Sequence, residues 1–76
     1  MEKKLETIFK KIFPNFKGRF NDSISPKNFS NWDSLGHLNL MNEISKKFKI
    51  NFSFNEIINV NSIKDLKKII KKKNVS

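Results

Sequence analysis

The sequence has no cysteine, so neither a disulfide nor a thiolate metal site can support its fold. It also has no continuous apolar run of the length that a signal peptide or a membrane span needs, because the first five residues lead straight into a mixed charged and apolar pattern. These absences predict a protein of the reducing cytoplasm with no membrane partner.

Acidic residues are scarce as well. Seven Asp and Glu stand against sixteen Lys and Arg, which gives a net charge of +9. A charge of this size favours polyanions or acidic protein surfaces as partners. Nearly all the cations are lysines, and only Arg19 can form bidentate contacts. Compositional drift toward Lys, Asn, Ile and Phe explains the charge equally well.

The 76 residues allow one domain, spanning 1–76, of a size that buries only about 60% of its unfolded surface. The apolar residues of the N-terminal segment have amphipathic spacing, which predicts a helix from Glu2 to Phe13 that ends before Pro14.

Residues 14–32 lack helical periodicity and are rich in turn formers. Their spaced aromatics predict a long loop pinned to the core. A base-stacking strand is the alternative, but no second aromatic strand accompanies it.

Residues 31–48 contain the central helix of the predicted bundle. Asp33 is its expected N-cap. At about 100° per residue, a broad apolar arc forms from Leu35, Leu38, Leu40, Met41, Ile44 and Phe48. Ser34 lies at the start of this helix, where its hydroxyl is expected to face solvent. We expect Trp32 to cover the start of the helix, and the single histidine, His37, to be a packed or rim residue rather than a proton shuttle.

The residues after the central helix are predicted to form a short extended link at 49–52 and two more helices. Ser53 and Glu56 match a capping box that opens a third helix of one or two turns. A fourth helix starts at Ser62, its lysines surround an apolar stripe, and residues 74–76 are expected to fray. The predicted fold is all-α: a small monomeric four-helix bundle with three longer helices, a short third helix and a long first loop.

The tripeptide Asp33-Ser34-Leu35 at the start of a second helix resembles the modification motif of acyl carrier proteins and related carrier domains. The likeness covers essentially the whole chain. It extends to the apolar positions of the central helix and its Phe48-x-Ile50 exit, to the acidic Glu56 and to the start of the last helix at Ser62-Ile63-x-Asp65-Leu66.

This resemblance implies a phosphopantetheine arm attached covalently to Ser34 by a phosphopantetheinyl transferase that uses coenzyme A. The thiol of the arm would carry an acyl or aminoacyl group as a thioester and present it to acyl-loading and acyl-using biosynthetic enzymes. The transferase would activate the hydroxyl, so the carrier itself would not be an enzyme. A phosphodiester beside a helix N-terminus is electrostatically favourable.

The resemblance also suggests which residues meet the partners. Those expected to take part in recognition are Asp33, Leu35, Gly36, Asn39, Met41, Glu43 and Glu56. Carriers of fatty-acid synthesis are strongly acidic, whereas Lys46 and Lys47 lie on the second helix here and Glu43 is its main acid. Like charges would slow docking to their usual partners. A specialised carrier for a dedicated biosynthetic enzyme is therefore at least as good a hypothesis.

A second hypothesis comes from a different class of function. The charge and the lysines between Lys64 and Lys73 suit a small basic helical domain that binds nucleic acid. Against it, no helix carries the set of Arg, Asn or Gln side chains that base readout requires.

Overall fold

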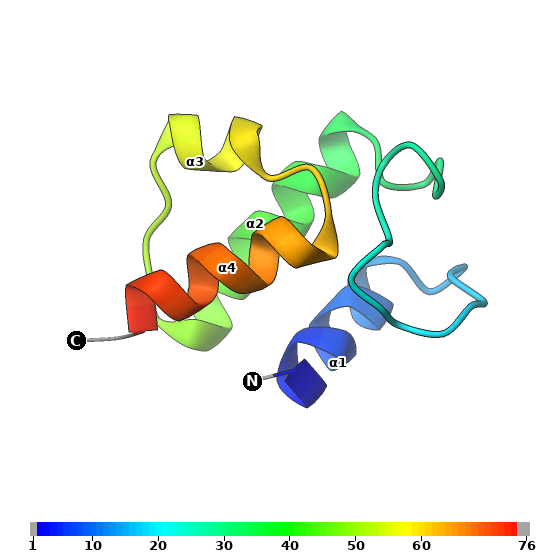
Figure 1. The fold of residues 1–76 in the computed structure, drawn as a ribbon, viewed down its shortest axis with the longest axis horizontal. Coiled ribbons are helices and arrows are strands. Elements are labelled where there is room, and N and C mark those ends of the chain that lie inside the picture. Colours follow the sequence, from blue (N-terminus) through cyan, green and yellow to red (C-terminus); the bar gives the residue numbers. More distant parts are fainter. Residues whose placement is uncertain (1, 75–76) are drawn as a thin grey trace.

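The computed structural model describes residues 2–74 and contains four helices (Figure 1). These are α1 (Glu2–Ile12), α2 (Ser34–Phe48), α3 (Phe54–Asn59) and α4 (Ile63–Asn74). No strand occurs in this described part, so the prediction of an all-α fold with a short third helix is confirmed. No helix within residues 2–74 is long and apolar enough to cross a membrane.

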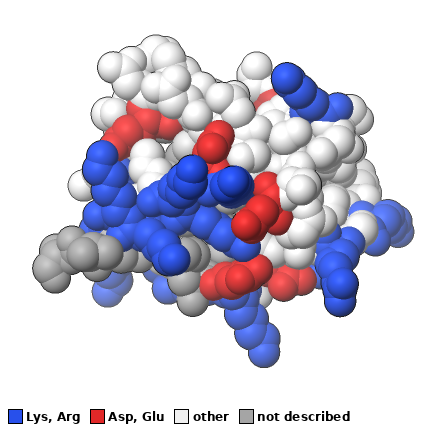
Figure 2. Space-filling model, viewed as in Figure 1, with Lys and Arg blue, Asp and Glu red and all other residues white. Residues whose placement is uncertain are grey.

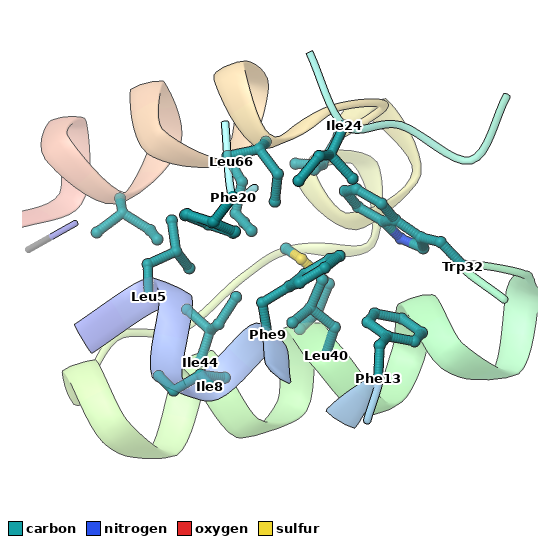
Figure 3. Packing of buried hydrophobic residues seen from close by; sticks show 14 residues of the cluster. Leu5, Ile8, Phe9, Phe13, Phe20, Ile24, Trp32, Leu40, Ile44 and Leu66 are labelled. Carbon is teal, nitrogen blue, oxygen red and sulfur yellow. The ribbon is translucent and has the colours of Figure 1, made fainter. Parts of the chain in front are cut away.

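One hydrophobic core joins α1, α2 and α4. Leu5, Leu40, Ile44, Leu66 and Ile70 are completely shielded from solvent. Figure 3 shows Phe9 near the middle of this cluster. The centroid of its ring lies within 6.0 Å of the centroids of five other aromatic rings, those of Phe13, Phe16, Phe20, Phe29 and Trp32. Tilted and edge-on pairs of this kind add to the stability that burial provides.

The long loop between α1 and α2 is pinned to the bundle, as its spaced aromatics predicted. Phe20, Ile24 and Trp32 are buried. The loop also closes the start of α4, because the backbone N–H of Ile63 donates to the carbonyl of Ile24 at 2.9 Å. The middle of the loop is thereby attached to the start of α4.

The expected apolar arc of α2 is too broad, and this prediction is wrong at two positions. Leu35 is 69% exposed and Leu38 is 54% exposed. At about 100° per residue, Leu38 lies roughly 110° and Leu35 roughly 170° from the mean direction of the buried residues. The buried residues of α2 are Leu40, Met41 and Ile44. Leu35 and Leu38 therefore point away from the core.

The element boundaries differ slightly from those predicted. The first helix ends at Ile12 rather than Phe13. The extended link begins one residue late, because Lys49 adopts a left-handed conformation (φ 56°, ψ 47°) as the C-cap of α2. The predicted capping box is present, since Ser53 and Glu56 exchange both hydrogen bonds. Asn74 is the last helical residue, and the fraying predicted for positions 75–76 lies outside the described residues.

Candidate functional site

The N-terminus of α2 presents an unshielded hydroxyl. Ser34 is the first residue of the helix and is exposed, as predicted. Its N-cap is Asp33, whose carboxylate accepts a 2.8 Å hydrogen bond from the backbone N–H of Gly36. The hydroxyl of Ser34 has no hydrogen-bond partner within residues 2–74, and the backbone N–H groups of Ser34 and Leu35 have none either. A nucleophilic oxygen therefore lies beside free N–H groups that favour a phosphate.

A groove of about 290 Å³ lies beside this hydroxyl. Its walls come from the loop, the first turn of α2 and the segment around the end of α3, and they consist of Pro26, Trp32, Asp33, Ser34, His37, Ile58, Val60 and Asn61. A flexible group attached to Ser34 would have an apolar surface to lie against. Sequence periodicity could not reveal this groove, because its walls come from three separate segments.

His37 holds the walls of that groove together. The indole N–H of Trp32 donates to Nδ1 of His37 at 2.8 Å, and the two rings stack with centroids 5.9 Å apart. The other ring nitrogen, Nε2, lies 2.6 Å from the carbonyl oxygen of Ile57 in α3. Because a carbonyl can only accept, Nε2 carries the proton and Nδ1 is the acceptor. The prediction of a packed or rim histidine is confirmed, with Trp32 1% exposed beside it.

The large exposed hydrophobic residues belong to α2 and α3, and Ile58 lines the groove beside Ser34. Within residues 2–74 they are Leu35 and Leu38 on α2, and Phe54 (75% exposed) and Ile58 (52% exposed) on α3. Helix α3 has no buried residue of its own. We call these four residues the apolar docking face. Exposed apolar side chains concentrated in one region mark sites of contact with other molecules.

The remaining residues expected to recognise partners have different environments. Asn39 is exposed. Met41 is only 1% exposed and belongs to the core, and its part in partner recognition stays a prediction. Gly36 is half-buried, and a Cβ placed there would lie 2.7 Å from Cε1 of Phe13 and 2.9 Å from the carbonyl oxygen of Asn31. Its lack of a side chain therefore lets α2 pack closely against these two residues.

Both predicted recognition glutamates are engaged within the protein. Glu43 lies 3.0 Å from the ammonium of Lys11 and 4.0 Å from that of Lys47. The hydrogen bond from Lys11 is the main reason that the pKa of Glu43 is lowered from its usual value. Glu56 pairs with Lys73 at 3.0 Å. Its pKa is lowered first by the capping hydrogen bond from the backbone of Ser53 and then by Lys73.

A second groove, of about 430 Å³, runs between α2 and α3. It is lined by Leu38, Asn39, Met41, Asn42, Ser45, Asn51, Phe52 and Ile57. None of these side chains is charged, and four of them are apolar. The groove starts one turn beyond the first and continues along α2 away from Ser34. Within residues 2–74, no cluster of three or more His, Asp or Glu side chains is placed to hold a metal ion.

Comparison with known proteins gives one informative match. A solved structure of a putative acyl carrier protein from Mycobacterium tuberculosis superposes on this chain with a TM-score of 0.83. The two sequences are 18% identical, and the match covers 93% of this chain and 95% of the other. No family model matches the sequence, and no curated protein matches it. The shared fold is thus established at the level of three-dimensional structure, and the predicted acyl-carrier-like bundle is confirmed.

Proposed function

We propose that this chain is an acyl carrier protein, formed by residues 1–76 as one carrier domain, with a phosphopantetheine arm on Ser34. The observation that carries the proposal is the Ser34 hydroxyl, which is exposed and without a hydrogen-bond partner among the described residues, at the capped N-terminus of α2. The fold supports this proposal, because the chain resembles a solved structure described as a putative acyl carrier protein.

The local chemistry supports attachment of the arm. The phosphate of the arm would lie at the N-terminus of α2, where free N–H groups and the helix dipole stabilise negative charge by about 0.3–1 kcal/mol at an exposed site. The arm supplies a thiol that holds the acyl group as a thioester. This chain's contribution is to position Ser34, to keep its oxygen accessible and to offer the adjoining grooves to the arm and its cargo.

The apolar docking face supports a role as a substrate of other enzymes rather than as a catalyst. A transferase that loads Ser34, or an enzyme that acts on the thioester, must approach the start of α2. There it would meet Leu35, Leu38 and Ile58 instead of a row of carboxylates. Because Glu43 and Glu56 are paired internally, partners that rely on a basic docking surface are disfavoured. We therefore favour a specialised carrier that serves a dedicated biosynthetic enzyme.

Transfer of the arm in vitro tests this proposal. The purified protein is incubated with coenzyme A and several broad-specificity phosphopantetheinyl transferases, and its intact mass is measured. We expect the wild type to gain one arm and Ser34→Ala to gain none. The matched control is Ser30→Ala, since Ser30 is an exposed serine four residues earlier and should leave the reaction unchanged. Circular dichroism should show that both variants are folded. A wild type that gains no mass with any transferase would contradict the proposal.

A further inference from the structure

The exposed charged side chains of α4 are all lysines, and its one acid, Asp65, is half-buried. Lys64, Lys68, Lys71 and Lys72 are all exposed, and none of them forms an ion pair within residues 2–74. At 100° per residue they span an arc of about 100° on the side opposite the buried residues of the helix. They extend about 12 Å along its axis. We call these four residues the α4 lysine stripe, and Figure 2 shows it as a blue area over α4.

Other lysines of α4 are held by carboxylates and do not contribute to this surface. The ammonium of Lys67 lies 2.5 Å from Asp22 and 2.9 Å from Glu2, and the hydrogen bond from Asp22 is the main reason that its pKa is raised. Lys73 pairs with Glu56. The stripe is therefore the part of α4 that keeps its charge available for another molecule.

The make-up of the stripe indicates what kind of molecule that is. None of the large exposed hydrophobic residues lies on α4, so the stripe lacks the apolar anchors that dominate protein–protein affinity. It lacks arginine, which recognises individual phosphates by bidentate contacts, and aromatic residues, which stack on bases. A row of lysines without anchors suits a laterally extended anionic surface, to which each charge contributes separately.

The position of the stripe also bears on its partner. In Figure 1, α2 begins at the upper right, whereas α4 runs across the front and ends at the lower left. A flat surface bound along the length of α4 therefore leaves the start of α2 accessible to an enzyme. Any single partner enzyme would instead have to extend from the apolar docking face around to α4.

We infer that the α4 lysine stripe binds the anionic headgroups of a membrane surface and holds the carrier there with Ser34 free. The choice of lipid over another polyanion rests on the proposed function, because acyl groups are building blocks of lipids. The absence of an apolar span predicted a protein with no membrane partner, and this inference departs from that expectation. Peripheral binding through charge requires no such span.

Vesicle sedimentation tests the inference with the apo protein. The vesicles contain phosphatidylcholine alone or with one third phosphatidylglycerol, at salt concentrations of about 0.01 M and about 0.15 M, where charges are screened beyond about 30 Å and about 8 Å respectively. We expect binding to the anionic vesicles only, weakening as salt rises. Ser34→Ala should bind like the wild type, so a failure of arm attachment and a failure of membrane binding are distinguishable.

Paired variants separate local charge from net charge. Lys68→Glu with Lys72→Glu changes the stripe, whereas Lys17→Glu with Lys27→Glu makes the same change of net charge on the exposed loop. Since one lysine near an anionic surface contributes about fivefold to partitioning, the stripe variant should bind more than tenfold more weakly. The loop variant should lose much less, and Lys68→Arg with Lys72→Arg should retain binding.

Three outcomes would overturn the inference. The first is no binding to anionic vesicles even at low salt. The second is an equal loss in the stripe and loop variants, which would leave only the net charge of the protein. The third is tighter binding of the stripe to a short DNA duplex than to the anionic vesicles under the same conditions, which would make nucleic acid the partner.

Discussion

Two surfaces of this small bundle differ in character. On α2 and α3, the apolar docking face exposes four large hydrophobic residues. Along α4, every large hydrophobic residue turns inward or is half-covered, and the α4 lysine stripe faces outward. Figure 2 shows the contrast, with a largely white upper region over α3 above the blue area over α4.

The two surfaces differ in how strongly they indicate that another molecule binds there. A charged outer face is what any amphipathic helix presents to water, so the case for a partner at α4 rests on four exposed lysines that form no ion pair within residues 2–74. Leucine and phenylalanine left in water lose the stabilisation that burial would give them. Leu35 and Leu38 lie within about one turn of Ser34, and Ile58 lines the groove beside it. These exposed side chains are therefore the stronger indication of function, and the tests below compare buried, docking and charged positions.

The largest effect on stability should come from exchanging a buried leucine of α2. Leu40 is completely buried, so Leu40→Ala should lower the free energy of unfolding by about 2–5 kcal/mol. Leu38, half a turn earlier on the docking face, should change it by less than about 0.5 kcal/mol when replaced by Ala. Urea unfolding measures both. For the rate of arm transfer per folded molecule, Leu38→Ala should have the larger effect and Leu40→Ala the smaller. A Leu38→Ala variant as unstable as Leu40→Ala would contradict the assignment of Leu38 to the docking face.

The next effect concerns the close packing at Gly36. Helix propensity alone predicts that Gly36→Ala stabilises α2 by about 1 kcal/mol. The added Cβ would, however, approach the backbone oxygen of Asn31 to 2.9 Å, and backbone cannot move aside as a side chain can. We expect a net loss of about 1–3 kcal/mol, as for other overpacked sites, measured by thermal or urea unfolding. A stabilised variant would show that α2 is not held this closely.

A comparable effect is expected where His37 joins α2 to α3. His37→Leu removes the acceptor for the indole N–H of the buried Trp32, and an unsatisfied buried donor costs about 1–3 kcal/mol. Amide hydrogen exchange should become faster in α3, which also loses its contact through the carbonyl of Ile57. His37→Gln, which retains a donor and an acceptor, should recover part of the loss. Unchanged exchange in α3 would contradict the bridging role.

The smallest effect is the pH dependence at the capping box. Because the folded pKa of Glu56 lies below its usual value near 4.5, its ionised form stabilises the fold above that pH. That contribution is lost as the pH falls through the lowered folded pKa. Replacement of Glu56 by Gln should flatten the fall of stability below pH 4.5, which urea unfolding at several pH values would detect. An identical loss of stability at low pH in the variant would mean that ionisation of Glu56 does not stabilise the folded state.

Much of the fold follows from local chemistry that sequence displays directly. Pro14 locates the end of α1 to within one residue, and the Ser53–Glu56 capping box locates the start of α3. The Asp33 cap and the exposure of Ser34 were predictable for the same reason, since each depends on neighbours only a few residues away.

The features that sequence did not reveal depend on distant segments. Leu35 and Leu38 were assigned to one wide apolar arc of α2, and only the packed bundle shows that the side bearing Leu40, Met41 and Ile44 is the one that is covered. The two-sided hydrogen bonding of His37 needs Trp32 and Ile57 on either side of one ring. The pairing of Glu43 with Lys11 joins α2 to α1 across 32 positions of the sequence. These contacts exist only once the bundle has formed.

The most direct test of the central claim is the intact mass of the protein isolated from growing cells of its native host, followed by mapping of any added mass to a peptide. The account predicts a population heavier by a phosphopantetheine arm, with or without an acyl group, and with the added mass on Ser34. Protein that is unmodified at Ser34 under every growth condition, in cells that tolerate Ser34→Ala without change, would contradict the account.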